Sequence, residues 1–225
     1  MKKRLISGLV VSLVLTVGGL YASNMAFKLN YTLDAQGPSS LTGQSTLALP
    51  FNPQTNLLNA SDLLNDIGGT ALVQAIGRFD PDTNGKTSYT GTAGSPFDLV
   101  PAEGYFVELK PGVATQSYIV VGSHDPSRSV VLYGQGQGPW PGGSLNGQSF
   151  YAWPYHSVSN DASELLDELG GTAAIQFVGQ VRRIDNGLTT YAGTAGTPFG
   201  LAPGEAYLVQ VKLGVSQVQF IPAHY

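Results

Sequence analysis

An acidic turn is the first candidate binding site in this sequence. Asp80, Asp82 and Asn84 carry side-chain oxygens at alternate positions, and Gly85 follows them. A calcium-binding loop opens in this way, because Ca²⁺ takes oxygen ligands and the chain must turn sharply around it. The acid that would close the loop is missing, since the twelfth position is Gly91. Calcium is therefore one interpretation of this segment, and an Asp/Asn-rich hairpin turn is the other.

Aromatic residues gather in the second half of the sequence. Exposed Trp and Tyr side chains can stack on sugar rings or form a protein interface. The alternative is that alternate members of the group fill a core. The predicted ligand-binding residues are Trp140, Tyr151, Trp153 and Tyr155.

The histidines give little sign of catalysis. His124 adjoins Asp125, and His156 lies near Asp161. However, the chain has neither a nucleophile elbow nor a pair of histidines at metal-ligand spacing. We therefore expect no enzymatic activity, and a secreted hydrolase is an alternative interpretation.

One segment of the sequence occurs twice. Residues 91–113 and 193–215 are related by a constant spacing of 102, and 14 of 23 positions are identical. Such self-similarity indicates a duplicated structural unit. Each copy predicts a Gly/Pro-rich turn followed by a strand that bears Tyr105 or Tyr207. Both turns contain a glutamate, Glu103 or Glu205, and this shared position favours a role in the turn.

A short helix and a hairpin are also predicted in each copy. Asn59 and Asp161 stand where a helix N-cap would, each with an acid three residues later, and a Gly-Gly pair ends each helix. Helices of about eight residues are not stable alone, so they must pack on a sheet. Asn84-Gly85 and Asn186-Gly187 each predict a tight turn between two strands.

These patterns predict a mainly β chain of two tandem repeats, each of about 100 residues. Each repeat is expected to be a small β-sandwich or barrel-like module with one short α-helix. The predicted boundaries are 23–124 for the first module and 125–225 for the second. The strand over 27–33 opens the first module, and we expect it to be unpaired and available to the sheet edge of another molecule.

Composition limits the classes of partner. Charged residues are 12% of the chain, the formal net charge is −4, and there are 29 Gly and 14 Pro. An acidic balance argues against a nucleic-acid partner, which requires a basic face. There is no Cys, so disulfides, thiolate chemistry and Cys-based metal sites are excluded.

The N-terminus has the pattern of an export signal. A basic start at Lys2, Lys3 and Arg4 precedes an apolar run, and Ala22 is the predicted cleavage position. Residues 1–22 are therefore interpreted as a signal peptide, and the destination as periplasm, cell surface or extracellular space. The alternative is an uncleaved leader, which would be the chain's only contact with a membrane.

The chain resembles a small β-module of bacterial secreted and surface proteins. The resemblance covers nearly all of the mature chain. It depends on a strand ending in Leu49-Pro50 or Trp153-Pro154, a short helix, an apolar strand, and the pattern from Pro101 to Tyr105. The second copy departs from this pattern, because Ala206 replaces the glycine before the tyrosine. The resemblance implies a non-catalytic extracytoplasmic module and no active site.

The sequence thus predicts an exported, non-catalytic structural or adhesive protein that associates with itself or with other surface components. A carbohydrate-binding module that uses the aromatic residues of the second repeat is the alternative. No cofactor is expected apart from the calcium considered above.

Overall fold

The computed structural model describes residues 27–53, 56–123, 125, 127–155 and 157–223. The predicted signal peptide, residues 1–22, and all three histidines lie outside these residues, as do the first residues of the predicted first module. Within the described part of the chain, no helix is both long enough and apolar enough to cross a bilayer.

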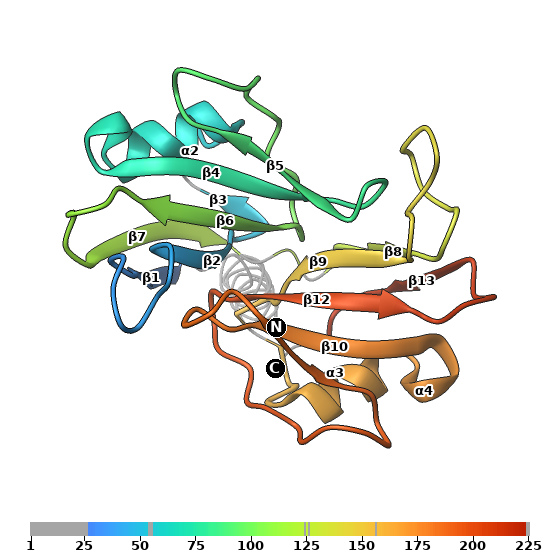
Figure 1. Ribbon diagram of the computed structural model, residues 1–225. Helices are drawn as coiled ribbons and strands as arrows, with labels where there is room; N and C mark the ends of the chain where they lie inside the picture. The colour runs from blue at the N-terminus through green and yellow to red at the C-terminus, as the bar shows by residue number, and fades with distance from the viewer. Residues whose placement is uncertain (1–26, 54–55, 124, 126, 156, 224–225) are drawn as a thin grey trace, which may run out of the picture.

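The chain is mainly β, as predicted, and its strands form antiparallel sheets (Figure 1). Residues 27–123 are called the first half here, and residues 127–223 the second half. In Figure 1 the first half, blue to green, lies above the second half, yellow to red.

A four-stranded sheet forms the centre of the first half, in the order β2-β6-β4-β5. These strands are β2 (Gln44–Ala48), β4 (Val73–Asp80), β5 (Gly85–Tyr89) and β6 (Gly104–Leu109). A second sheet has the order β1-β7-β3 and consists of β1 (Phe27–Leu33), β3 (Asn52–Pro53) and β7 (Gln116–Ser123). The expectation of an unpaired first strand is wrong, because every residue of β1 pairs with β7.

The second half has a four-stranded sheet of the corresponding order, β9-β12-β10-β11. Its strands are β9 (Gln148–Ala152), β10 (Ile175–Val181), β11 (Leu188–Tyr191) and β12 (Ala206–Val211). A two-stranded sheet accompanies it, formed by β8 (Val130–Tyr133) and β13 (Gln217–Phe220). The strands β8 and β13 pair antiparallel, as β1 and β7 do.

Each four-stranded sheet carries one capped helix. The helix α2 (Ala60–Ile67) begins at Asn59, whose side chain accepts hydrogen bonds from two backbone N–H groups. The helix α3 (Ala162–Glu168) begins at Asp161 in the same manner. The second half adds a short α4 (Gly171–Ala174) where the first has a 3₁₀ turn, η1 (Gly69–Ala71), so the expectation of one helix per module holds for the first half alone.

Both predicted hairpin turns are present. Asn84 and Asn186 have positive φ angles of 52° and 54°, and the strands on either side of each turn pair antiparallel. Asparagine tolerates this left-handed conformation better than most residues do. The sequence pattern was therefore sufficient to locate both hairpins.

Each half buries its own apolar core. In the first, Tyr105 on β6 is fully buried beneath α2 residues such as Leu63. In the second, Tyr207 on β12 is fully buried beneath α3 residues such as Leu165. Both helices lie on the outer sides of the molecule in Figure 1, away from the place where the halves meet.

The two halves meet through reciprocal contacts. Ala48 N–H donates to Gly204 O at 2.8 Å, and the equivalent Ala152 N–H donates to the equivalent Ala102 O at 2.9 Å. Leu41 N–H donates to Arg183 O at 3.1 Å, and a bond of 2.7 Å joins the equivalent residues Leu145 and Pro81. An interface in which each side repeats the contacts of the other has approximate two-fold symmetry, as in a homodimer.

A third apolar cluster lies on this junction. Phe106 and Phe150 stack there with ring centroids 4.6 Å apart. Gly104 faces its own sequence equivalent, Ala206, so closely that a Cβ on Gly104 would lie 2.2 Å from the Ala206 Cβ. The two halves are thus in close contact at this cluster.

Candidate functional site

The structure separates the four aromatic residues that the sequence grouped together. Trp140 and Tyr151 line a cavity at the junction. Trp153 is only 6% exposed and packs in the core of the second half. Tyr155 is 37% exposed and stacks on Phe27, with ring centroids 5.0 Å apart. A shared site for these residues stays a prediction, and the structure places two of them together.

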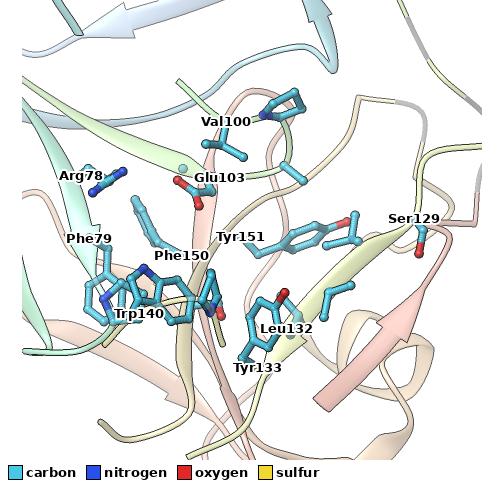
Figure 2. A pocket seen from close by; sticks show the side chains of 18 of the residues that line it. Arg78, Phe79, Val100, Glu103, Ser129, Leu132, Tyr133, Trp140, Phe150 and Tyr151 are labelled. Atoms are coloured by element: carbon cyan, nitrogen blue, oxygen red, sulfur yellow. The ribbon is translucent and has the colours of Figure 1, made fainter. Parts of the chain in front are cut away.

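The cavity has a volume of about 310 Å³ and takes residues from both halves (Figure 2). The first half contributes the end of β4 and the turn before β6, and the second contributes β8, β9 and the loop between them. Its polar and aromatic lining includes Arg78, Glu103, Arg128, Ser129, Tyr133, Trp140 and Tyr151. This volume is at the lower end of the range for small-molecule sites.

Glu103 extends into this cavity without a protein partner. Its side chain makes no hydrogen bond or ion pair within the described part of the chain, although its backbone N–H donates to Val100 O. Burial raises the pKa of Glu103, and the nearby Arg78 guanidinium opposes that rise. A half-buried carboxylate of this kind has unused capacity to accept hydrogen bonds.

Arg78 is the second polar group with unused capacity. Its Nε is buried and has no hydrogen-bond partner among the described residues. The guanidinium lies over the ring of Phe97, with Cζ 5.2 Å from the ring centroid. Figure 2 shows Arg78 and Glu103 on the same side of the cavity, opposite Tyr133.

The equivalent place in the second half is closed by protein contacts. Glu205, the equivalent of Glu103, accepts hydrogen bonds from Arg183 Nη2 at 3.0 Å, Gln180 Nε2 at 3.2 Å and Tyr207 Oη at 3.3 Å. Arg183 also pairs with Asp34 of the first half at 2.6 Å. The first half has Pro81 where the second has Arg183, so Glu103 has no such cation.

Tyr31 fills the space beside Glu205. A Cβ on Gly204 would lie 2.6 Å from Tyr31 Cε1, and the Tyr31 hydroxyl donates to Ala48 O at 2.5 Å. At the cavity, the residue equivalent to Gly204 is Ala102, which forms part of the lining. On the strand β8 the inward-facing residues are Val130 and Leu132, both smaller than a tyrosine. Smaller side chains and a missing cation therefore leave one of two related crevices open.

The loop that carries Trp140 is longer than its counterpart. Ten residues separate β1 from β2, whereas fourteen separate β8 from β9. Backbone hydrogen bonds fix this longer loop, including Gly136 N–H to Ser144 O and Ser144 N–H to Gln137 O. Trp140 packs edge-on against Tyr133, with ring centroids 5.6 Å apart and an interplanar angle of 87°. The loop thus presents an aromatic wall to the cavity.

Tyr151 forms the floor of the cavity. It lies on β9, is 2% exposed, and joins the first half through a bridge to Glu103. Burial raises the pKa of the Tyr151 hydroxyl well above its usual value, so this group stays protonated. Its hydroxyl has no hydrogen-bond partner within the described residues.

The predicted calcium residues form a hairpin turn in the structure. Asp80 Oδ2 accepts a hydrogen bond from Thr87 Oγ1 at 3.5 Å. A hydrogen bond with Asp80 raises the pKa of Asp82, and Asn84 Oδ1 is buried without a hydrogen-bond partner among the described residues. No cluster of three or more His, Cys, Asp or Glu side chains suited to a metal lies within the described part of the chain. Calcium binding at Asp80, Asp82 and Asn84 stays a prediction.

Sequence reasoning missed Arg78 and assigned Glu103 to a turn alone. A signal for both was present in the differences between the two copies. Arg78 corresponds to Gln180, and Pro81 corresponds to Arg183. These substitutions beside a shared glutamate show that the glutamate has a different environment in each copy.

Comparisons with protein-family models, with curated proteins and with solved structures found no significant match.

Proposed function

We propose that this chain is an exported, non-catalytic binding protein whose ligand site is the cavity at the junction of its two halves. It consists of two tandem modules, residues 23–124 and 125–225, each a small β-sandwich with a helix on its outer side. A signal peptide over residues 1–22 directs it out of the cytoplasm. Its ligand is a saccharide.

One observation carries this proposal. Two related crevices lie at the junction, and only the crevice at Glu103 is left open, whereas Tyr31 and Arg183 fill the one at Glu205. Its walls combine aromatic rings with two polar groups, Arg78 and Glu103, whose side chains have no hydrogen-bond partner in the described part of the chain. Sugars present apolar C–H faces and hydroxyl edges, so they match a site of aromatic surfaces and a few fixed polar groups.

The experiment is a glycan array followed by calorimetry on the mature chain. Trp140→Ala should abolish binding, because the loop residue forms one wall of the cavity. Tyr155→Ala is the matched control, since this tyrosine lies outside the cavity and stacks on Phe27. Loss of binding with Tyr155→Ala and retention with Trp140→Ala would move the site away from the cavity.

A structural role through self-association is the second candidate. The observation that favours it is the position of β1 at one edge of its sheet, where part of its backbone lies outside the ladder with β7. Light scattering at increasing concentration tests it. A chain that stays monomeric at high concentration excludes this role.

A further inference from the structure

We infer that the saccharide bound at the junction is an acidic sugar, and that Arg78 is the residue that pairs with its carboxylate. This inference rests on the proposed function and specifies the chemical class of the ligand.

Arg78 has donors that the protein does not use. Its Nε is buried and unpartnered among the described residues. Buried polar groups of folded proteins are rarely left without a partner, because the lost hydrogen bonds to water are costly. The terminal Nη groups of Arg78 also make no hydrogen bond among the described residues, and a guanidinium can bind a carboxylate end-on through two parallel N–H groups of this kind. A ligand carboxylate in the cavity would therefore pair with the terminal nitrogens of a guanidinium whose donors the protein leaves unused.

Glu103 does not serve as that partner. It lies close enough to Arg78 for each charge to affect the other, yet no ion pair joins their side chains. Stacking over Phe97 holds the guanidinium in place. In the second half, by contrast, the protein pairs Glu205 directly with Arg183. The first half keeps its cation and its carboxylate apart, with space for a ligand beside them.

The charge of the lining favours an anion. The cavity lining contains two arginines, Arg78 and Arg128, and one carboxylate, that of Glu103. The whole chain has a formal net charge of −4, so this excess of cations is local. Glu103 would then accept hydrogen bonds from sugar hydroxyls, while Arg78 takes the carboxylate. A neutral sugar offers hydroxyl acceptors to Arg78 but leaves the guanidinium charge without an anionic partner.

The aromatic residues distinguish a sugar from a simple anion. Trp140 and Tyr133 form a wall from edge-on rings, and Tyr151 closes the floor. An inorganic anion would bury little of this surface, whereas a pyranose ring would cover it. The volume of about 310 Å³ limits the occupant to one sugar unit, for example the end of a chain.

The test is calorimetry on the mature chain with matched pairs of ligands. Glucuronate is compared with glucose, and galacturonate with galactose, with acetate as a carboxylate that has no ring. At least one acidic sugar should bind about tenfold or more tightly than its neutral counterpart, because a hydrogen bond to a charged group contributes that much. Arg78→Gln should abolish this preference. Arg78→Lys should retain only part of it, because lysine keeps the charge but lacks the planar fork.

Arg182→Gln is the matched control. Arg182 is an exposed arginine that pairs with Asp185 and does not line the cavity. Its substitution should leave the preference for acidic over neutral sugars unchanged. Circular dichroism must show that the Arg78 variants fold. If Arg78→Gln does not fold, the comparison with Arg78→Lys still tests the inference.

Three outcomes overturn the inference. Equal binding of neutral and acidic sugars, unchanged by Arg78→Gln, removes the acidic class and leaves the saccharide function standing. Binding of acetate as tight as that of the uronates shows a simple anion site. If no sugar binds here or on the glycan array, the proposed function itself fails.

Discussion

Glu103 and Glu205 occupy equivalent positions in two different environments. Three side-chain donors satisfy Glu205, whereas Glu103 lies at a cavity and receives none from the described residues. Their effects on stability should therefore be opposite in sign. A carboxylate that is buried without partners destabilises the folded chain, and one that is well paired stabilises it.

The pH dependence of stability tests the environment of Glu103. Because burial raises the pKa of Glu103 above its usual 4.5, the folded chain holds this proton more tightly than the unfolded chain does. Its contribution to stability is fully present below pH 4.5 and is lost as the pH rises through the folded pKa. Glu103→Gln should remove this loss, so that the urea midpoint falls less between pH 4.5 and neutrality.

Glu205→Gln provides the contrast. This substitution breaks the ion pair with Arg183 and weakens the bonds from Gln180 and Tyr207. The midpoint should fall at neutral pH by the equivalent of about 1–3 kcal/mol. Equal effects of the two substitutions would contradict the difference between the crevices.

A second pair of residues tests backbone strain. Ala102 has a φ angle of 72°, a region that costs a residue with a Cβ about 1–2 kcal/mol. The equivalent Gly204 has φ 88° and lies against Tyr31. Ala102→Gly should raise the free energy of unfolding by up to about 1 kcal/mol, after the entropy of glycine in the unfolded chain is subtracted.

Gly204→Ala should have the opposite effect and lower the free energy of unfolding by about 2 kcal/mol or more, since its Cβ would overlap Tyr31. Chemical denaturation of the two variants side by side measures both. A neutral Gly204→Ala would show that Tyr31 can move aside.

The sequence predicted the helix caps and the hairpin turns correctly. The caps at Asn59 and Asp161 and the turn at Asn84 were found because capping and turn geometry depend on a few neighbouring residues. Tyr133 follows Tyr31 at the repeat spacing of 102, but the two tyrosines have different environments. Tyr31 is buried in the core, whereas Tyr133 packs on Trp140, because the buried residues of β8 are Val130 and Leu132.

At the scale of elements, the sequence predicted most strands and both capped helices but not how the strands associate. The alternation of apolar residues indicates which face of β6 or β12 is buried. It carries no information on partners far away in sequence, so the pairing of β1 with β7 was not foreseen. Nor was the cavity, since its lining comes from strands of both halves.

The start of β6 is where the four-stranded sheets approach most closely. Gly104→Ala would place a Cβ 2.2 Å from that of Ala206 and 2.8 Å from Phe150 Cδ1. We expect a loss of about 1–3 kcal/mol in the free energy of unfolding, the usual cost of overpacking. Ala206→Gly is the reverse change on the opposite side and should cost about 1 kcal/mol or less.

Guanidinium chloride titrations of both variants give the comparison. If Gly104→Ala were as stable as the parent chain, the halves would not be packed together as closely as the structure shows.

At the scale of the whole molecule, the junction should make unfolding cooperative. Its third apolar cluster joins the two cores, and Arg183 connects Asp34 in the first half to Glu205 in the second. Both tryptophans, Trp140 and Trp153, belong to the second half. Tryptophan fluorescence therefore reports on one half, while far-ultraviolet circular dichroism reports on both.

In the parent chain these two probes should give coincident unfolding curves. Arg183→Ala should separate the curves, because it removes the ion pairs that connect the halves. Arg182→Ala, which removes only an exposed pair with Asp185, should leave them coincident. Coincident curves in both variants would assign the cohesion of the halves to their apolar contacts alone.

The sequence repeat predicted two similar units, over residues 23–124 and 125–225. It did not indicate that the units would contact each other through equivalent residues. That arrangement depends on shape and on small residues such as Gly104, whose role is visible only beside its neighbour Ala206.

The reciprocal junction has a consequence for how this protein could change over time. The ion pairs of Arg183 with Asp34 and Glu205 already connect the halves, so the residues around Glu103 are not needed for that connection. Substitutions at Arg78 or in the Trp140 loop therefore change the ligand specificity of the cavity, while the Arg183 ion pairs still hold the two halves together. A duplicated chain of this kind can diversify one pocket without risking its architecture.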